Sequence, residues 1–138
     1  MSVSFTIMAI LIPIFLYINN SYQTTIIKNR DYFYTKETFA YIESALIQDA
    51  VAATVNNNTI YITKNNGING EKITNVVEKR FSNIYVKYYT NDVLQSSNIV
   101  LRNIKDLNIK IKNKILYVSI TLLDEFYIER CLPLNYLN

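Results

Sequence analysis

Histidine is missing from this sequence, and other residues that build catalytic and metal sites are scarce. Without histidine there is no imidazole base for a serine or cysteine nucleophile and no imidazole ligand for a transition metal. The single cysteine, Cys131, excludes an internal disulfide and a site with several thiolate ligands. Both glycines, Gly67 and Gly70, follow asparagine in one predicted turn, so no glycine-rich phosphate loop is expected. We therefore predict no enzyme activity, no bound metal and no cofactor.

Strong charge of one sign is also missing, because 14 basic and 11 acidic side chains leave a formal net charge of only +3. Dedicated nucleic-acid proteins carry a larger basic excess, since they neutralise many phosphates. The carboxylates are scattered, and none forms the spaced cluster of a calcium loop or an acid–base pair. Half of the 138 residues are hydrophobic, which is enough to fold one small domain.

What the sequence does contain is an uncharged apolar run from Val3 to Ile18. At about 1.5 Å per residue, a helix of this length spans about 24 Å, slightly less than the roughly 30 Å hydrocarbon core of a bilayer. No basic residue precedes the run and no small-residue cleavage site follows it, which disfavours a cleaved secretory signal. We predict a retained membrane or filament anchor over residues 1–20. A signal peptide and a helix buried within the protein are the alternatives.

Residues 19–54 contain neither proline nor glycine and are compatible with a helix that continues the anchor. In the second half of this stretch, apolar side chains recur every three or four residues: Phe39, Ile42, Leu46, Ala50 and Ala53. This spacing indicates one face of an amphipathic helix, which we predict over residues 21–55. Residues 22–33 are more polar, and a helix of this total length needs something outside the chain to pack along it.

After residue 56 the period of the apolar side chains changes from 3.6 to 2, which predicts β-strands. Strands are expected at residues 59–63, 84–90, 107–112, 115–122 and 126–132, with a turn at Asn113-Lys114. Residues 72–81 are ambiguous between strand and helix, and residues 99–101 form a weaker strand. We predict one antiparallel sheet of about four to six strands over residues 56–138. The expected fold class is α+β, with a long N-terminal helix, made of an apolar anchor and an amphipathic half, packed on this small sheet.

This order of elements, over the whole chain, resembles that of type IV pilins and pseudopilins. The start Ser4-Phe5-Thr6-Ile7 is similar to the family's processing site, in which a small residue precedes the phenylalanine that becomes the first mature residue. The resemblance implies that prepilin peptidase cuts between Ser4 and Phe5. Ser4 replaces the family's glycine, and Ala9, four residues after the phenylalanine, replaces its usual glutamate. The tail from Ile115 to Leu137 is most similar to the ComGF family of competence pseudopilus subunits.

The resemblance implies a structural minor pilin or pseudopilin that acts in filament initiation or at the filament tip of a type IV pilus-like or competence (DNA-uptake) apparatus. In the family, the glutamate pairs with the amino terminus of a neighbouring subunit, so Ala9 would suit a tip position. The partners would be other pilins of the filament, the membrane and prepilin peptidase. The protein would be a single-pass membrane protein with an extracytoplasmic head, located at the cell surface after assembly. Lys28 and Arg30 follow the anchor and, by the positive-inside tendency alone, favour a cytoplasmic head.

Two other functions remain open. Lys110, Lys112 and Lys114 would share one face of an extended segment, and such a stripe could contact DNA phosphates. Lysines on an exposed strand also commonly prevent sheets from aggregating, and we prefer this explanation. A tethered DNA-binding module is therefore one alternative. An anchored accessory protein of another envelope or secretion machine is the other.

Overall fold

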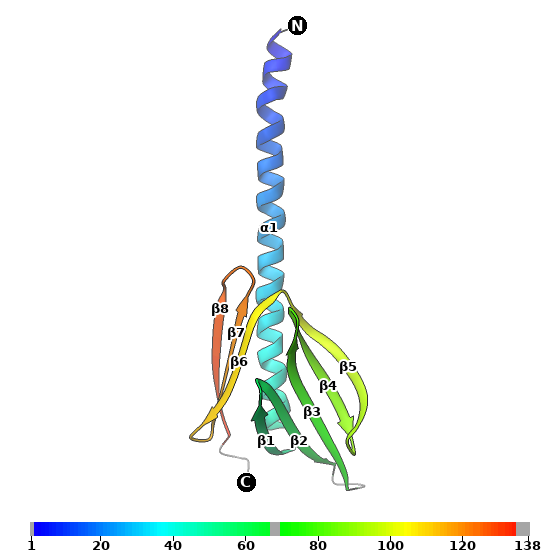
Figure 1. Ribbon diagram of the computed structural model, residues 1–138. Coiled ribbons are helices and arrows are strands. Elements are labelled where there is room, and N and C mark those ends of the chain that lie inside the picture. Colours follow the sequence, from blue (N-terminus) through cyan, green and yellow to red (C-terminus); the bar gives the residue numbers. More distant parts are fainter. Residues whose placement is uncertain (1, 67–69, 135–138) are drawn as a thin grey trace. The chain divides into compact units, whose positions relative to one another are not determined.

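The computed structural model describes residues 2–66 and 70–134. Within them one helix, α1 (Ser2–Ile47), precedes eight strands (Figure 1). The chain divides into two compact units, Met1–Phe33 and Tyr34–Asn138. The first unit is the beginning of α1, and the second unit holds the rest of α1 together with the strands. The predicted α+β class, with a long N-terminal helix and antiparallel strands, is confirmed.

The second unit contains two antiparallel sheets, where the sequence predicted one small sheet. Five strands form a sheet in the order β1-β2-β3-β4-β5, and three form a sheet in the order β6-β7-β8. Each strand pairs with its neighbour along the chain, so both sheets are meanders. The strands are β1 (Ala50–Asn56), β2 (Thr59–Asn66), β3 (Glu71–Arg80), β4 (Asn83–Thr90), β5 (Val93–Arg102), β6 (Ile104–Lys112), β7 (Ile115–Leu122) and β8 (Tyr127–Pro133).

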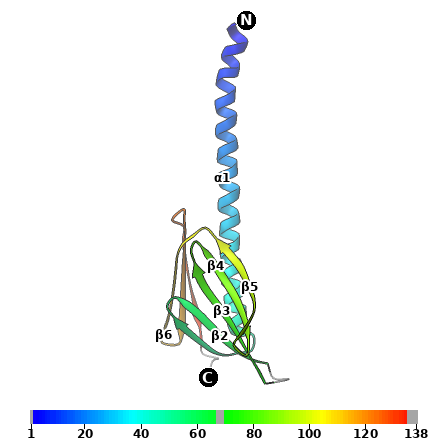
Figure 2. The same cartoon turned by 45° about the vertical axis from the view of Figure 1, so that its right-hand side comes forward.

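The core of the second unit lies where residues 34–47 of α1 pass between the two sheets (Figures 1 and 2). Ile42 and Leu46 are fully buried there. They belong to one apolar cluster that includes Ile60, Ile62, Val77, Ile84, Val86 and Leu101 from the larger sheet, and Leu107, Leu116, Val118 and Ile120 from the smaller. Strand β7 alternates strictly between buried and half-buried positions, as expected for a strand with one face on a core. Helix and sheets therefore share a single core.

The helix ends earlier than the sequence predicted, at Ile47, and the predicted boundary between helix and sheet at residue 55 is wrong. Asp49 has a φ of 58°, the left-handed conformation that commonly reverses the chain after a helix. Strand β1 then begins at Ala50, with a shift in its register against β2 between Ala50 and Ala52. Ala50 and Ala53 pack against the core from this irregular strand, so their three-residue spacing reflects a bulge and not a helical turn.

Asparagine performs the role of glycine in the hairpins of this glycine-poor chain. Three two-residue turns have positive φ at both positions: Asn57-Asn58, Asn91-Asp92 and Asn113-Lys114. This is the conformation of a type I′ turn, and asparagine and aspartate tolerate it because their side chains can hydrogen-bond locally. The predicted turn at Asn113-Lys114 is confirmed. Part of the turn predicted around Gly67 lies outside the described residues, but Gly70 has a φ of 67°.

Phe81 breaks this pattern, because it stands in the turn between β3 and β4 with a φ of 53° and a side chain that is 91% exposed. A bulky residue rarely adopts positive φ, since its Cβ approaches the following carbonyl oxygen. We expect Phe81→Asn to raise the free energy of unfolding by about 1 kcal/mol, because it relieves this strain without removing buried contacts. Urea denaturation followed by circular dichroism measures the change. Phe81→Ala, which retains the strain, is the control; a loss of stability in Phe81→Asn would contradict the prediction.

Candidate functional site

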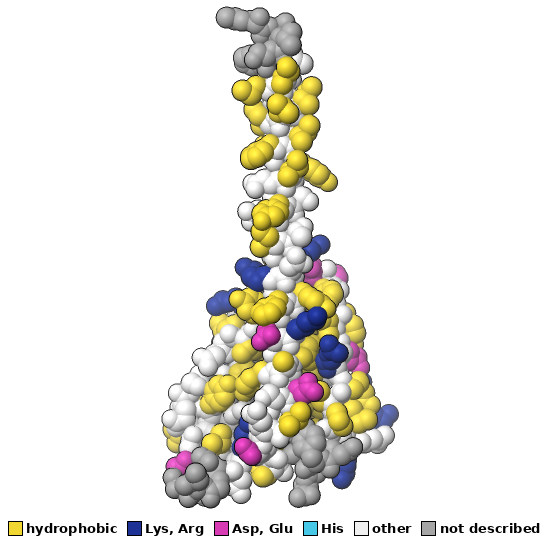
Figure 3. All heavy atoms as spheres, turned by 180° about the vertical axis from the view of Figure 1, so that it is seen from behind, with side chains coloured by type: hydrophobic (Ala, Val, Ile, Leu, Met, Phe, Trp, Pro, Cys, Tyr) yellow, Lys and Arg dark blue, Asp and Glu magenta, His cyan; other side chains and the backbone are white. Residues whose placement is uncertain are grey.

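The first unit exposes apolar side chains around the whole helix between Ile7 and Ile18, and Figure 3 shows hydrophobic side chains along this part of α1. The exposed large side chains are Ile7, Met8, Ile10, Leu11, Ile12, Ile14, Phe15, Leu16, Tyr17 and Ile18. Residues 14–18 alone are five consecutive positions, which together cover more than one turn of a helix. A helix that is apolar on all sides is stable inside lipid or a protein bundle rather than in water.

The predicted processing site lies at the beginning of this helix. Ser4 and Phe5 belong to helix α1, and the structure describes their backbone but not their side chains. Ala9 is exposed within the apolar segment. Across the residues that the structure describes, no helix combines the length and the hydrophobicity needed to cross a membrane.

Beyond Ile18 the large exposed apolar side chains of the first unit become sparser, and they are Tyr22, Ile26, Ile27, Tyr32 and Phe33. Phe15, Ile18, Tyr22 and Ile26 are all exposed and follow one another at spacings of three or four residues, so they lie on one face. Elsewhere on this stretch, the hydroxyls of Thr24 and Thr25 each donate to the carbonyl four residues before, at 2.9 Å. Because these hydroxyls are already paired within the helix, a neighbouring helix can cover them without leaving an unpaired donor.

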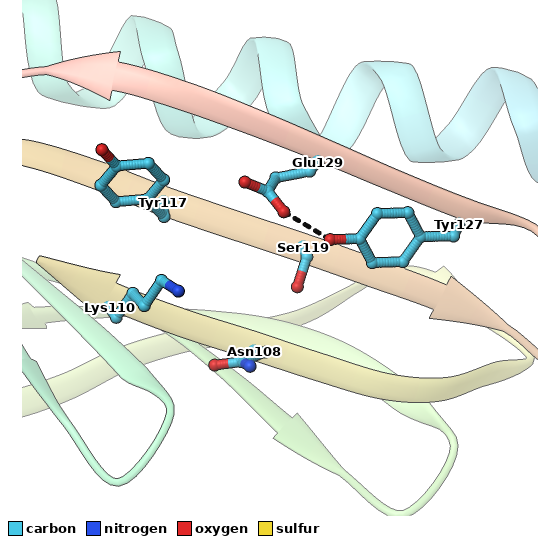
Figure 4. Close-up of a pocket in the computed structure, with 6 residues that line it drawn as sticks. All are labelled: Asn108, Lys110, Tyr117, Ser119, Tyr127 and Glu129. Atoms are coloured by element: carbon cyan, nitrogen blue, oxygen red, sulfur yellow. Dashed lines mark hydrogen bonds between the residues drawn. The ribbon is translucent and has the colours of Figure 1, made fainter.

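In the second unit, the face of β6, β7 and β8 that points away from the core is polar (Figure 4). A shallow pocket of about 100 Å³ is lined by Asn108, Lys110, Tyr117, Ser119, Tyr127 and Glu129. The ammonium of Lys110 lies 5.5 Å from the ring centroid of Tyr117, a cation–π contact. The hydroxyl of Tyr127 donates a hydrogen bond to Glu129, which raises the pKa of this phenol because the carboxylate favours its neutral form. Lys110 and Tyr117 thus contact each other, as do Tyr127 and Glu129, and neither pair combines a nucleophile with a base.

Two of the three lysines predicted to contact DNA share this face. Lys110 and Lys112 are two residues apart on β6 and both are exposed, whereas Lys114 lies in the following turn with a φ of 58°. Glu129 adds a negative charge to the same surface. It lies opposite Ser119 on the neighbouring strand, and both residues line the pocket together with Lys110. The prediction of three lysines on one strand face is therefore wrong for Lys114, and the face is less basic than the sequence suggested.

Sequence reasoning missed a charged cluster on the face of the larger sheet that points away from the core. Glu78 Oε1 lies 2.6 Å from Lys87 Nζ and 2.6 Å from Arg80 Nε. Lys87 is only 8% exposed, so its charge is paired in a partly desolvated setting. Glu78 and Lys87 stand on adjacent strands and become neighbours only through the β3–β4 register. The cluster borders a depression of about 280 Å³ that Tyr61 and Tyr89 also line.

A second unpredicted contact joins α1 to the larger sheet inside the second unit. Asn75 Nδ2 donates to the hydroxyl of Tyr41 at 3.1 Å, and the rings of Tyr41 and Tyr88 meet edge to face with centroids 6.4 Å apart. Burial, and then the neighbouring Tyr88, raise the pKa of the Tyr41 phenol well above its usual range. The hydroxyl therefore stays neutral, and the contact positions α1 on the sheet.

Within residues 2–66 and 70–134, no group of three acidic or cysteine side chains is close enough to hold a metal ion. The one thiol, Cys131, is exposed on β8. Comparisons of the chain with protein-family models, with curated proteins and with solved structures gave no match.

Proposed function

We propose that this protein is a structural minor pilin or pseudopilin, similar to the ComGF family, that assembles into a filament through α1. The observation that carries the proposal is the apolar surface of the first unit between Ile7 and Ile18. Leaving this surface in water costs about 25 cal/mol per Å², so the segment requires lipid or neighbouring helices to cover it. In the same helix, residues 34–47 are held in the core of a separate folded unit. One helix thus supplies both an assembly segment and the centre of a head.

In the proposed mechanism, residues 7–18 rest in the bilayer before assembly and then exchange lipid for the matching segments of neighbouring subunits. The exchange is possible because lipid and other apolar helices cover the same surface. The paired hydroxyls of Thr24 and Thr25 extend the surface that neighbours can cover, since no donor is lost. Ala9 offers no carboxylate to a neighbouring amino terminus, which suits a subunit that begins or caps the filament.

The proposal places the head outside the cytoplasmic membrane, and Cys131 tests this. The thiol is exposed, so a membrane-impermeant maleimide can reach it without denaturant. We expect the reagent to label the protein in intact cells. Cys131→Ser, which removes the one thiol of the sequence, measures background labelling. Labelling that occurs only after the membrane is permeabilised would put the head in the cytoplasm, as Lys28 and Arg30 alone favour, and would overturn the proposal.

A tethered DNA-binding module is the second candidate, because Lys110 and Lys112 share an exposed face with Tyr117 and Tyr127. Lysine contacts to phosphates and tyrosine stacking on bases would both use such a face. The support is weaker, since Lys110 already contacts the Tyr117 ring and Glu129 repels phosphate. An accessory protein of another envelope machine would share the apolar helix but not the filament.

A further inference from the structure

The two sheets have four edge strands, and three of them are protected against pairing with another chain. Strand β1 contacts β6, and Asn58 beside it accepts a hydrogen bond from the Ile109 N–H at 3.3 Å. Strand β6 carries charges that include Lys110 and Lys112, and β8 carries Glu129, Arg130 and Pro133. Charged side chains, proline and covering elements are the usual means by which proteins prevent an edge strand from pairing.

Strand β5 is the least protected of the four, because its one charge, Arg102, lies at its end. Its residues 93–101 contain no charge and no proline, and residues 93–99 are exposed. Among the described strands only β4 pairs with it, so the backbone N–H and C=O groups along its other side have no strand partner. An exposed, uncharged stretch of seven residues at a sheet edge is a template for strand addition.

The register of β5 limits where a new strand can pair. Pairing with β4 is regular from Ser96, opposite Tyr88, to Ile99, opposite Tyr85. One residue of β5 without a partner on β4 lies directly before this segment, and another lies directly after it. These extra residues, Gln95 and Val100, are bulges that twist the strand locally. The regular segment available for pairing is therefore Ser96–Ile99.

We propose that β5 pairs antiparallel with β5 of a second copy of this chain. Charge selects this occupant: self-pairing of β6 or β8 would bring like charges together, whereas residues 96–99 meet their own copies at no electrostatic cost. The small polar side chains of Ser96, Ser97 and Asn98 can also hydrogen-bond across such a pair. Charge complementarity is a common basis for recognising a different protein, and residues 93–101 of β5 carry no charge that could provide it.

Symmetry makes the pairing specific. A two-fold axis perpendicular to the sheet keeps each side chain on the same face in both copies, so one residue must lie opposite itself. Within the regular segment, that residue is Ser97 or Asn98. A contact of four residues per chain is far smaller than a stable interface of about 1,200 Å² or more, so the pairing is weak in solution and depends on a high local concentration. The inference concerns the second unit and does not rest on the proposed function.

Disulfide trapping tests the pairing in the full chain, purified in detergent micelles. In a Cys131→Ser background, Ser97→Cys or Asn98→Cys should form a disulfide-linked dimer under mild oxidation, because directly opposed strand residues meet the distance that a disulfide needs. The control is Asn108→Cys in the same background, which places the thiol on the outer face of β6. It also measures dimers that arise from α1. We expect about tenfold more dimer at position 97 or 98 than at position 108.

A charge exchange identifies the partner as a second copy. The charge is placed at whichever of positions 97 and 98 does not trap. Beside a trapping Asn98→Cys thiol, Ser97→Lys and Ser97→Glu should each lower the trapping when tested alone, because position 97 is then the diagonal neighbour of its own copy, and an equal mixture of the two should restore it. Beside a trapping Ser97→Cys thiol, Asn98→Lys and Asn98→Glu serve the same purpose. Circular dichroism checks that each variant retains its strands. Dimer yields at positions 97 and 98 equal to that at position 108 would overturn the proposal. A mixture that traps no better than the separate variants would also overturn it.

Discussion

Leu11→Arg combined with Phe15→Arg should release the protein from membranes and remove it from filaments. Both side chains are exposed in the apolar segment of the first unit. An arginine near the centre of a membrane helix costs about 2.5–3.5 kcal/mol, so the pair costs about 5–7 kcal/mol. This corresponds to a change in partition of about 4 × 10³-fold to 10⁵-fold. The measurements are the fraction of protein retained in carbonate-washed membranes and the amount found in filaments sheared from cells.

The matched control for this variant is Asn19→Arg combined with Gln23→Arg. It adds the same two charges, at the same spacing, to the more polar stretch of the same unit. We expect it to remain in the membrane fraction. If both double variants stayed in the membrane, the apolar segment would not be the anchor. If the Leu11 and Phe15 variant left the membrane while filaments formed normally, the protein would be an accessory of another machine.

Ile42→Ala should lower the free energy of unfolding of the second unit by about 4 kcal/mol. Ile42 is fully buried, and it belongs to the cluster in which α1 meets both sheets. Truncating such a side chain costs about 2–5 kcal/mol, because it removes apolar contacts and leaves a cavity that the surrounding structure fills only partly. The upper half of this range is expected, since rigid elements surround the site on both sides. Since domains of this kind are stable by only about 5–15 kcal/mol, the variant should unfold at a much lower urea concentration.

Ile47→Ala is the control for Ile42→Ala, because it makes the same chemical change in the same helix at a side chain that is 63% exposed. We expect it to change the unfolding free energy by less than about 0.5 kcal/mol. Circular dichroism during urea unfolding measures both variants. Equal losses of stability would mean that the helix is not the centre of the core.

Patterns within short segments of the sequence predicted the helix and individual strands, but not where the helix ends or how the strands divide into sheets. The alternation of apolar residues along β7 predicted that strand, and the long stretch without proline or glycine after the apolar segment predicted most of the remaining helix. The end of α1 was missed, because Ala50 and Ala53 fit a helical face as well as they fit a bulged strand. Division into two sheets was not predictable, because β5 and β6 follow each other almost directly and a single residue, Asn103 with a φ of 60°, lies between them.

Contacts between distant residues were beyond the reach of the sequence. Glu78 and Lys87 become an ion pair only after β3 and β4 align in one particular register, and nothing in their spacing indicates it. Asn75 reaches Tyr41 across 34 positions of the chain. The apolar segment of α1 was predictable because its signal is local: ten large apolar side chains lie between Ile7 and Ile18.

The meander topology has a consequence for how quickly the head folds. Every strand pair joins neighbours along the chain, and several are closed by turns of only two residues. Short loops cost little closure entropy, and proteins dominated by such local contacts fold faster than those that must bring distant strands together. The hairpins can therefore form one after another as the chain emerges. The slow step should be the docking of α1, whose residues 39–46 belong to a core cluster that extends along the chain as far as Leu134.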